Sequence, residues 1–198
     1  MSISLQKGQK ISLSKESGGA GLSRVMVGLG WDQVQAAKKG FFAAKPAEID
    51  CDASALLLQN GHLTGVKDLV YFGNLRHESG AVAHMGDNLT GAGDGDDEQI
   101  LIDLDRVPAI YDRLVLVVNI YKGLERKQHF GMIENAFIRL VNEQNGQELC
   151  RYDLRDNYDN MLAMIFGEVY RHNGEWKFNP IGQPTQDPGL KELMMRFT

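Results

Sequence analysis

The stretch Ala136–Leu154, AFIRLVNEQNGQELCRYDL, decides the fold class of this 198-residue chain. Apolar and polar residues alternate along both of its arms, and Asn145-Gly146 stands between the arms. Alternation with a period of two is typical of half-buried β-strands, and Asn-Gly is a strong signal for a tight hairpin turn. The stretch therefore predicts an antiparallel β-hairpin.

Outside this hairpin, the same pattern recurs along the chain. The segment GEVYRHNGEWKF predicts a second hairpin with its turn at Asn173-Gly174, and a further turn is predicted at Asn60-Gly61. The run LVLVVNIY, residues 114–121, is the most apolar and β-branched part of the sequence. It predicts a buried central strand.

The two ends of the chain carry their own signals. The segment ISLQKGQKISLS alternates around Lys7 and Gly8, which predicts two strands joined by a turn. After Asp187-Pro188, GLKELMMRF has apolar residues at helical spacing and predicts a short amphipathic helix. Many short strands with little helix predict a single all-β domain over residues 1–198. The expected architecture is an antiparallel β-sandwich of two sheets with short peripheral helices, including the C-terminal one.

Composition and charge exclude several classes of protein. Hydrophobic residues at 43% and charged residues at 24% are ordinary globular values, and the formal net charge is -5. No block of Lys and Arg is present, so nucleic acid is not an expected partner.

Cys51 and Cys150 form no CxxC motif and are expected to be reduced. The N-terminus lacks the apolar run of a signal peptide, and no stretch is apolar enough to span a bilayer. We therefore expect a cytoplasmic protein without direct membrane insertion.

The segment Gly86–Glu98, GDNLTGAGDGDDE, is the main candidate for chemistry, because glycines alternate there with acids and amides. Calcium takes about six to eight oxygen ligands, which carboxylates, amides and backbone carbonyls supply. Zinc and copper prefer the His and Cys that this segment lacks. The segment has room for an EF-hand loop, but Leu89 and Gly91 stand where that loop has acids or amides, and both flanks are predicted strands. An EF-hand is therefore not predicted.

Further oxygen ligands are available elsewhere in the sequence. Asp50 and Asp52 share one face of a predicted strand. Asp32 ends the strand GLGWD, and Asn74 ends VYFGN. We expect these segments to converge with the acidic segment at one end of the sandwich, where a cation would offset the repulsion among the carboxylates. From spacing alone, a solvated acidic surface turn stays open as the alternative.

Other reactive residues form no recognisable site. The five histidines show no metal-ligand spacing, and neither Ser54 nor Cys51 lies in a nucleophile motif. The glycines of VGLGWD are not followed by the Gly-Lys of a phosphate-binding loop, so strand packing explains them better than phosphate binding.

Seven motifs occur in order along nearly the whole chain: KGxxISL, VGLGWD, DxDAS, GDNxTGxGxGDDE, AFIRLVN, RYDL and FGEVYRHNGEWKF. Together they resemble the TerD family of tellurium-resistance and stress-response proteins. The resemblance implies a β-sandwich that binds calcium, usually as two ions. Members often have Tyr-Asn where this chain has Phe72-Gly73, so Asn74 is the candidate replacement for their amide. The other metal ligands that the resemblance implies are Asp32, Asp50, Asp52, Asp87, Asp96, Asp97 and Glu98, supported by Asn88 and the carbonyls of Gly91 and Gly93.

The resemblance also implies a function. It predicts a non-enzymatic stress protein, implicated in resistance to tellurite and other chemical stress, whose calcium orders the acidic loops and so creates or withdraws a surface for partners. The implied partners are other Ter-family proteins, some of them associated with membranes. One alternative from another class stays open: a metal-dependent hydrolase or phosphotransferase whose carboxylate cluster holds a catalytic ion.

Overall fold

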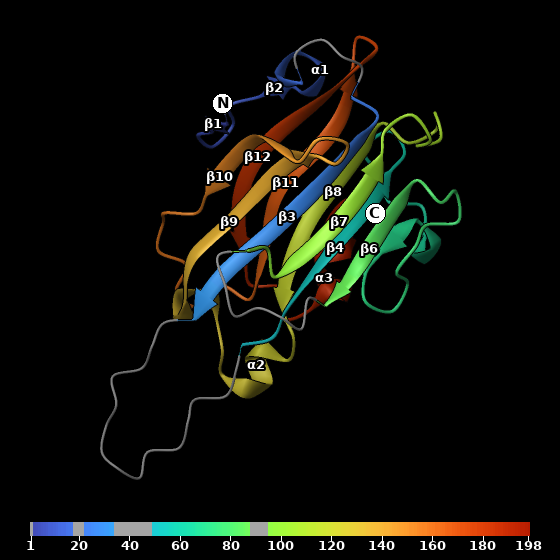
Figure 1. Ribbon diagram of the computed structural model, residues 1–198. Helices are drawn as coiled ribbons and strands as arrows, with labels where there is room; N and C mark the ends of the chain where they lie inside the picture. Colours follow the sequence, from blue (N-terminus) through green and yellow to red (C-terminus); the bar gives the residue numbers. More distant parts are fainter. Residues whose placement is uncertain (1, 18–21, 34–48, 88–94) are drawn as a thin grey trace.

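The computed structural model describes residues 2–17, 22–33, 49–87 and 95–198. Within these ranges the chain forms two six-stranded sheets that pack face to face (Figure 1). Neighbouring strands are antiparallel, apart from one parallel pair at the edge of the first sheet. The predicted antiparallel β-sandwich is therefore confirmed.

The first sheet has the strand order β1-β10-β9-β3-β7-β6. Its strands are β1 (Ile3–Ser4), β3 (Arg24–Gln33), β6 (Val82–Asp87), β7 (Glu98–Asp103), β9 (Ile133–Asn142) and β10 (Gln147–Asp153). β9 and β10 form the hairpin predicted around Asn145-Gly146. In its turn Gly146 has a φ of 70°, a left-handed conformation that glycine adopts without steric cost.

The second sheet has the strand order β2-β12-β11-β8-β4-β5. Its strands are β2 (Ile11–Ser12), β4 (Cys51–Leu58), β5 (Leu69–Val70), β8 (Arg113–Ile120), β11 (Ala163–His172) and β12 (Glu175–Thr185). β11 and β12 form the second predicted hairpin, and Asn173 and Gly174 both have positive φ in its turn. β8 lies between β11 and β4 and is buried from its second residue onward, as predicted for a central strand.

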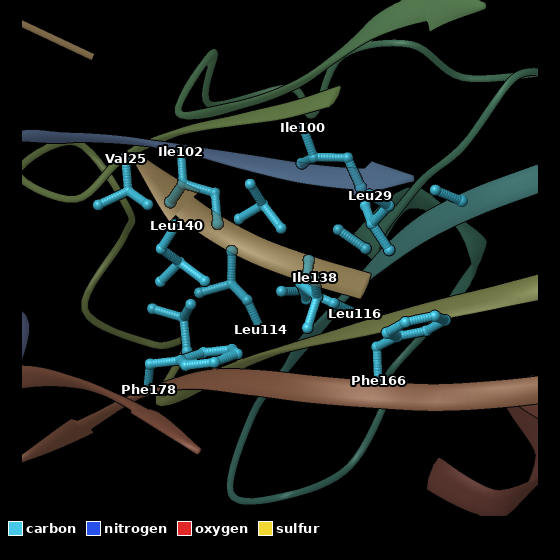
Figure 2. Close-up of a cluster of buried hydrophobic side chains, with 14 of the residues drawn as sticks. Val25, Leu29, Ile100, Ile102, Leu114, Leu116, Ile138, Leu140, Phe166 and Phe178 are labelled. Carbon is cyan, nitrogen blue, oxygen red and sulfur yellow. The ribbon is translucent and has the colours of Figure 1, made fainter. Parts of the chain in front are cut away.

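The core lies between the two sheets. Figure 2 shows Leu29 and Ile100 of the first sheet facing Leu116 and Phe166 of the second, and all four are buried. Complete burial of one such side chain contributes about 1.5–3 kcal/mol. Packing between the sheets is therefore a main source of the stability of the sandwich.

The two predicted N-terminal strands are present, and they belong to different sheets. The turn at Lys7 and Gly8 is present, and Gly8 N donates to the carbonyl of Pro180. However, β1 pairs with β10 in the first sheet, whereas β2 pairs with β12 in the second. The two strands therefore do not pair with each other. Alternation predicts an extended strand but does not specify its partner.

Short helices lie at the periphery of the sandwich. They are α1 (Leu13–Glu16), α2 (Gly123–Arg126) and α3 (Leu190–Met194), with 3-10 turns η1 (Val66–Asp68), η2 (Phe130–Met132) and η3 (Met195–Phe197). α3 confirms the predicted C-terminal helix. Its Leu193 is fully buried among residues of the second sheet, so the helix covers that sheet. Among the residues described, no helix combines the length and apolar character needed to cross a lipid bilayer.

Four strand ends meet at one end of the sandwich, the lower end in Figure 1. β3 and β6 end there, and β7 begins there, because Glu98 pairs with Leu29 on one side and Asp87 on the other. β4 begins beside them, since Ala53 N donates a hydrogen bond to the Glu98 side chain. Segments far apart in the sequence are thus brought together here.

Candidate functional site

We call this end of the molecule the acidic end. It comprises Asp50 and Asp52 at the start of β4, and Asp96, Asp97 and Glu98 at the start of β7. Asp96 and Asp97 directly precede β7, and Glu98 is its first residue. Each of these three consecutive acids contacts a different segment of the chain.

Glu98 points into the space between the sheets. It alternates with Gln99, lies on the same strand face as Ile100, and is only 5% exposed. Its Oε2 accepts a hydrogen bond from the backbone of Ala53 in the opposite sheet. His84 of β6 brings Nε2 to 3.5 Å from the same oxygen. This imidazole nitrogen is buried and makes no hydrogen bond within the described part of the chain. Glu98 therefore links the two sheets inside the acidic end.

Asp97 bonds to the end of β3 through both its backbone and its side chain. Its N–H donates to the carbonyl of Leu29 over 2.8 Å. Its Oδ2 accepts from the N–H of Trp31 over 2.7 Å. These bonds fix the residue before β7 against β3.

Asp96 turns to the outer face of the first sheet. Arg139 of β9 donates to both carboxylate oxygens, over 2.7 Å from Nε and 3.0 Å from Nη2. The carboxylate lies over Gly28 of β3, where an added Cβ would overlap it. The hydrogen bond to Asp96 raises the pKa of Arg139, so the guanidinium stays charged.

Asp50 and Asp52 flank a buried thiol. Cys51 is buried, whereas Asp50 is exposed and Asp52 half-buried. Asp50 lies 3.9 Å from Arg126 Nη1 of α2. Burial raises the pKa of the Cys51 thiol well above its usual value, and the negative charges of Glu98, Asp52, Asp50 and Asp97 raise it further. Carboxylates of two segments, β4 and the start of β7, therefore act electrostatically on one thiol.

Two other predicted ligands contact different segments. Asp32, near the end of β3, is exposed, and its Oδ2 accepts a hydrogen bond from Asn135 Nδ2 over 2.8 Å. Asn74 Nδ2 donates to the carbonyl of Leu69 over 2.8 Å, in the turn after β5. Asp32 therefore lies at the rim of the acidic end, and Asn74 is bonded to the β5 segment instead.

The remaining predicted ligands are described only in part. Asp87 ends β6 and pairs through its backbone with Glu98, but its side chain lies outside the described residues, as do Asn88, Gly91 and Gly93.

The oxygen donors of the acidic end are the kind that calcium prefers and zinc does not. Across residues 2–17, 22–33, 49–87 and 95–198, no three His, Cys, Asp or Glu side chains lie close enough together to hold a metal ion. The described carboxylates thus fit calcium in their chemistry, and an ion there would need further ligands.

The sequence alone did not identify His84 or Arg139 as residues of this region. The sequence carried a signal for His84, whereas the position of Arg139 depends on the strand register. His84 comes two residues after the buried Val82, so it faces inward on β6. Arg139 lies opposite Gly28 in the strand register, where the missing side chain leaves space for a carboxylate.

A second buried acidic centre lies at the other end of β4. Asp68 is fully buried, and it accepts hydrogen bonds from the hydroxyl groups of Thr64 and Tyr111. His77, also buried, brings Nε2 to 3.8 Å from Asp68 Oδ1. Burial acts to raise the pKa of Asp68, but the hydrogen bonds from Thr64 and Tyr111 outweigh it, and the pKa lies below its usual value. The carboxylate is therefore stabilised in its charged form by the chain's own donors.

Known proteins with similar sequences and folds agree with this architecture. The TerD domain family model matches residues 1–197. The chain is 54% identical to the stress response protein SCP2 of Bacillus subtilis (strain 168), over 100% of both chains. It is 47% identical to the tellurium resistance protein TerD of Serratia marcescens, over 92% of this chain and 91% of that one.

Among solved structures, the crystal structure of a protein of unknown function, SAV2460, has a similar fold. The TM-score is 0.64 at 22% identity, with 88% of this chain and 97% of that chain covered. The family match spans residues 1–197, and about half of the aligned residues are identical in each of the two sequence relatives. The chain therefore belongs to the TerD family.

Proposed function

We propose that this protein is a non-enzymatic, calcium-binding protein that contributes to resistance against tellurite and other chemical stress. Relatives named for stress response and tellurium resistance support the biological setting. The observation that carries the calcium proposal is the buried carboxylate of Glu98, which bonds to Ala53 directly after Asp52 and directly follows Asp97 in the chain.

The physical argument rests on repulsion. Glu98 is buried between the sheets, Asp97 directly precedes it, and Asp52 lies next to Ala53 of β4, whose N–H bonds to Glu98. Like charges this close repel each other, and a low-dielectric environment strengthens the repulsion. A divalent cation with oxygen ligands would offset it. Glu98, Asp97 and Asp52 are the described residues that would hold the ion, and Asp87 and the acidic loop after it remain the proposed source of the other ligands.

Calcium would also order the segments that carry these ligands. Under this proposal, ion binding creates or withdraws a surface at the acidic end for other Ter-family proteins, some of them membrane-associated. A binding role of this kind requires no reaction at the ion.

Titration calorimetry tests the proposal directly. The wild-type protein should take up calcium, and magnesium should bind far more weakly because it demands near-octahedral geometry and releases its water reluctantly. The double variant Asp52→Asn, Glu98→Gln should lose calcium binding. Asp153→Asn is the matched control, since Asp153 bonds to Arg151 over 2.7 Å on β10 and should leave calcium binding unchanged. Wild-type protein that takes up no calcium would overturn the proposal.

A turnover assay separates the binding role from the hydrolase alternative. No calcium-dependent hydrolysis of p-nitrophenyl phosphate is expected from the wild-type protein. Hydrolysis that requires a metal and disappears in the Asp52→Asn, Glu98→Gln variant would favour the enzyme instead.

A further inference from the structure

Gly28 leaves space for a carboxylate on the outer face of the first sheet, and we call this space the seat. In the strand register it lies between Arg139 of β9 and Gln99 of β7. An added Cβ would overlap the carboxylate of Asp96. The φ of Gly28 is not among the positive ones, so the space above this residue, and not its backbone conformation, requires glycine.

The residues on either side of this seat hold Asp96 firmly. Arg139 donates two parallel hydrogen bonds, and Gln99 Nε2 donates a third to Asp96 Oδ2 over 3.1 Å. The Asp96 side chain is 0% exposed and that of Arg139 is 28% exposed. Glu148 of β10 accepts from Arg139 Nη1 over 3.3 Å and helps to orient the guanidinium. A buried bidentate pair of this kind is geometrically specific.

The seat matters because two more carboxylates come directly after Asp96 in the chain. They belong to Asp97 and Glu98, which bond to the backbone of Trp31 and Ala53 respectively. A carboxylate fixed on the outer face thus sets the point from which Asp97 reaches β3 and Glu98 reaches the space between the sheets.

We propose that Asp96 is not a calcium ligand, and that Asp96 and Arg139 form a positioning pair, seated over Gly28, that presents Asp97 and Glu98 to the ion. This inference rests on the proposed calcium function. It assigns Arg139 and Gly28 a role in ion binding although neither would touch the ion.

Calcium calorimetry on Arg139→Gln and Gly28→Ala tests the inference. Each variant should bind calcium about tenfold to a hundredfold more weakly, the usual effect of losing a group that orients a metal ligand. Gly28→Ala displaces the carboxylate without changing any charge. Arg139→Lys keeps the charge but not the bidentate geometry, so its loss should be intermediate. In Asp96→Asn the number of bound ions should equal that of the wild type.

The opposite role for Asp96 predicts opposite results. If Asp96 were a ligand that Arg139 holds back, Arg139→Gln would free it and calcium would bind more tightly. Asp96→Asn would then reduce the number of bound ions. Either result would overturn the inference.

Two controls separate positioning from general stability. Arg151→Gln removes an Arg–Asp pair from β10 in the same sheet, and it should leave calcium affinity unchanged. A merely structural role for Arg139 would lower the melting temperature equally with and without calcium and leave the affinity as it was. If the wild-type protein bound no calcium, the proposed function would fail. If it bound calcium and both Arg139→Gln and Gly28→Ala bound it equally well, only this inference would fail.

Discussion

Asp68 and Glu98 are both buried carboxylates, but the chain surrounds them differently. Asp68, at one end of β4, receives hydrogen bonds from two hydroxyl groups. Glu98, at the other end, receives one from a backbone N–H and has other carboxylates nearby. The first centre balances its charge with neutral donors, whereas the second accumulates negative charge.

This difference separates a structural centre from a candidate binding site. A buried carboxylate whose donors are in place stabilises the fold as it stands. Carboxylates that repel each other lower the stability of the fold until a bound cation offsets the repulsion. A variant at Asp68 should therefore lose the same stability with and without calcium, whereas a variant at Glu98 should lose stability mainly when calcium is present.

The largest effect is expected at the structural centre. Asp68→Asn should lower the free energy of unfolding by about 2–4 kcal/mol, because it weakens two hydrogen bonds to a buried charged group. Chemical denaturation with and without calcium measures this loss, which should be the same in both conditions. A loss that calcium restores would place Asp68 in the binding site.

The same variant should show a defined pH dependence. The folded-state pKa of Asp68 lies below its usual value, so its stabilisation is present above the unfolded pKa of about 3.9 and is lost as pH falls through the folded pKa. The stability difference between wild type and Asp68→Asn should therefore narrow below about pH 4. A difference that stays constant on further acidification would contradict this.

Glu98→Gln, in contrast, should lose stability only when calcium is present. Without calcium its stability should change by less than about 1 kcal/mol, because glutamine keeps an oxygen acceptor for Ala53 N–H and removes one charge. The wild-type protein should gain roughly 2.7 kcal/mol at a hundredfold excess of calcium over its dissociation constant, and the variant should lose most of that gain. An equal gain in both proteins, measured by thermal unfolding, would exclude Glu98 as a ligand.

The smallest effect is expected at Cys51. Burial, and then the nearby carboxylates, hold its pKa well above its usual value. Because negative charges raise a thiol pKa, Asp52→Asn or bound calcium should lower the pKa of Cys51. The thiolate absorbance as a function of pH, in a Cys150→Ser background, measures the change. A titration unaffected by both treatments would show that the carboxylates do not act on this thiol.

The parts of the fold that could be predicted from the sequence have local signals. Asn145-Gly146 and Asn173-Gly174 stand between arms that alternate within a few residues, so turn and strands are specified together. The pairing of β1 and β2 with different sheets was not predicted, because two-residue strands carry too few side chains to specify a distant partner.

The candidate site likewise has contacts that the sequence could predict and contacts that it could not. The sequence predicted that the acidic segment would converge with Asp32, Asp50, Asp52 and Asn74. Asp97 and Glu98 bond to the backbone of Trp31 and Ala53, the neighbours of Asp32 and Asp52, whereas Asn74 bonds to Leu69. The contact between Arg139 and Asp96 was not predicted. It depends on β3 lying between β9 and β7, and on the absence of a side chain at one position of β3.

A crystal structure of the protein grown in millimolar calcium tests the central claim most directly. We predict anomalous density at the acidic end, with calcium roughly 2.3–2.6 Å from oxygens of Glu98 and its neighbouring carboxylates, and with Asp96 still bonded to Arg139. Carboxylates that point away from one another, with only water between them, would contradict the account.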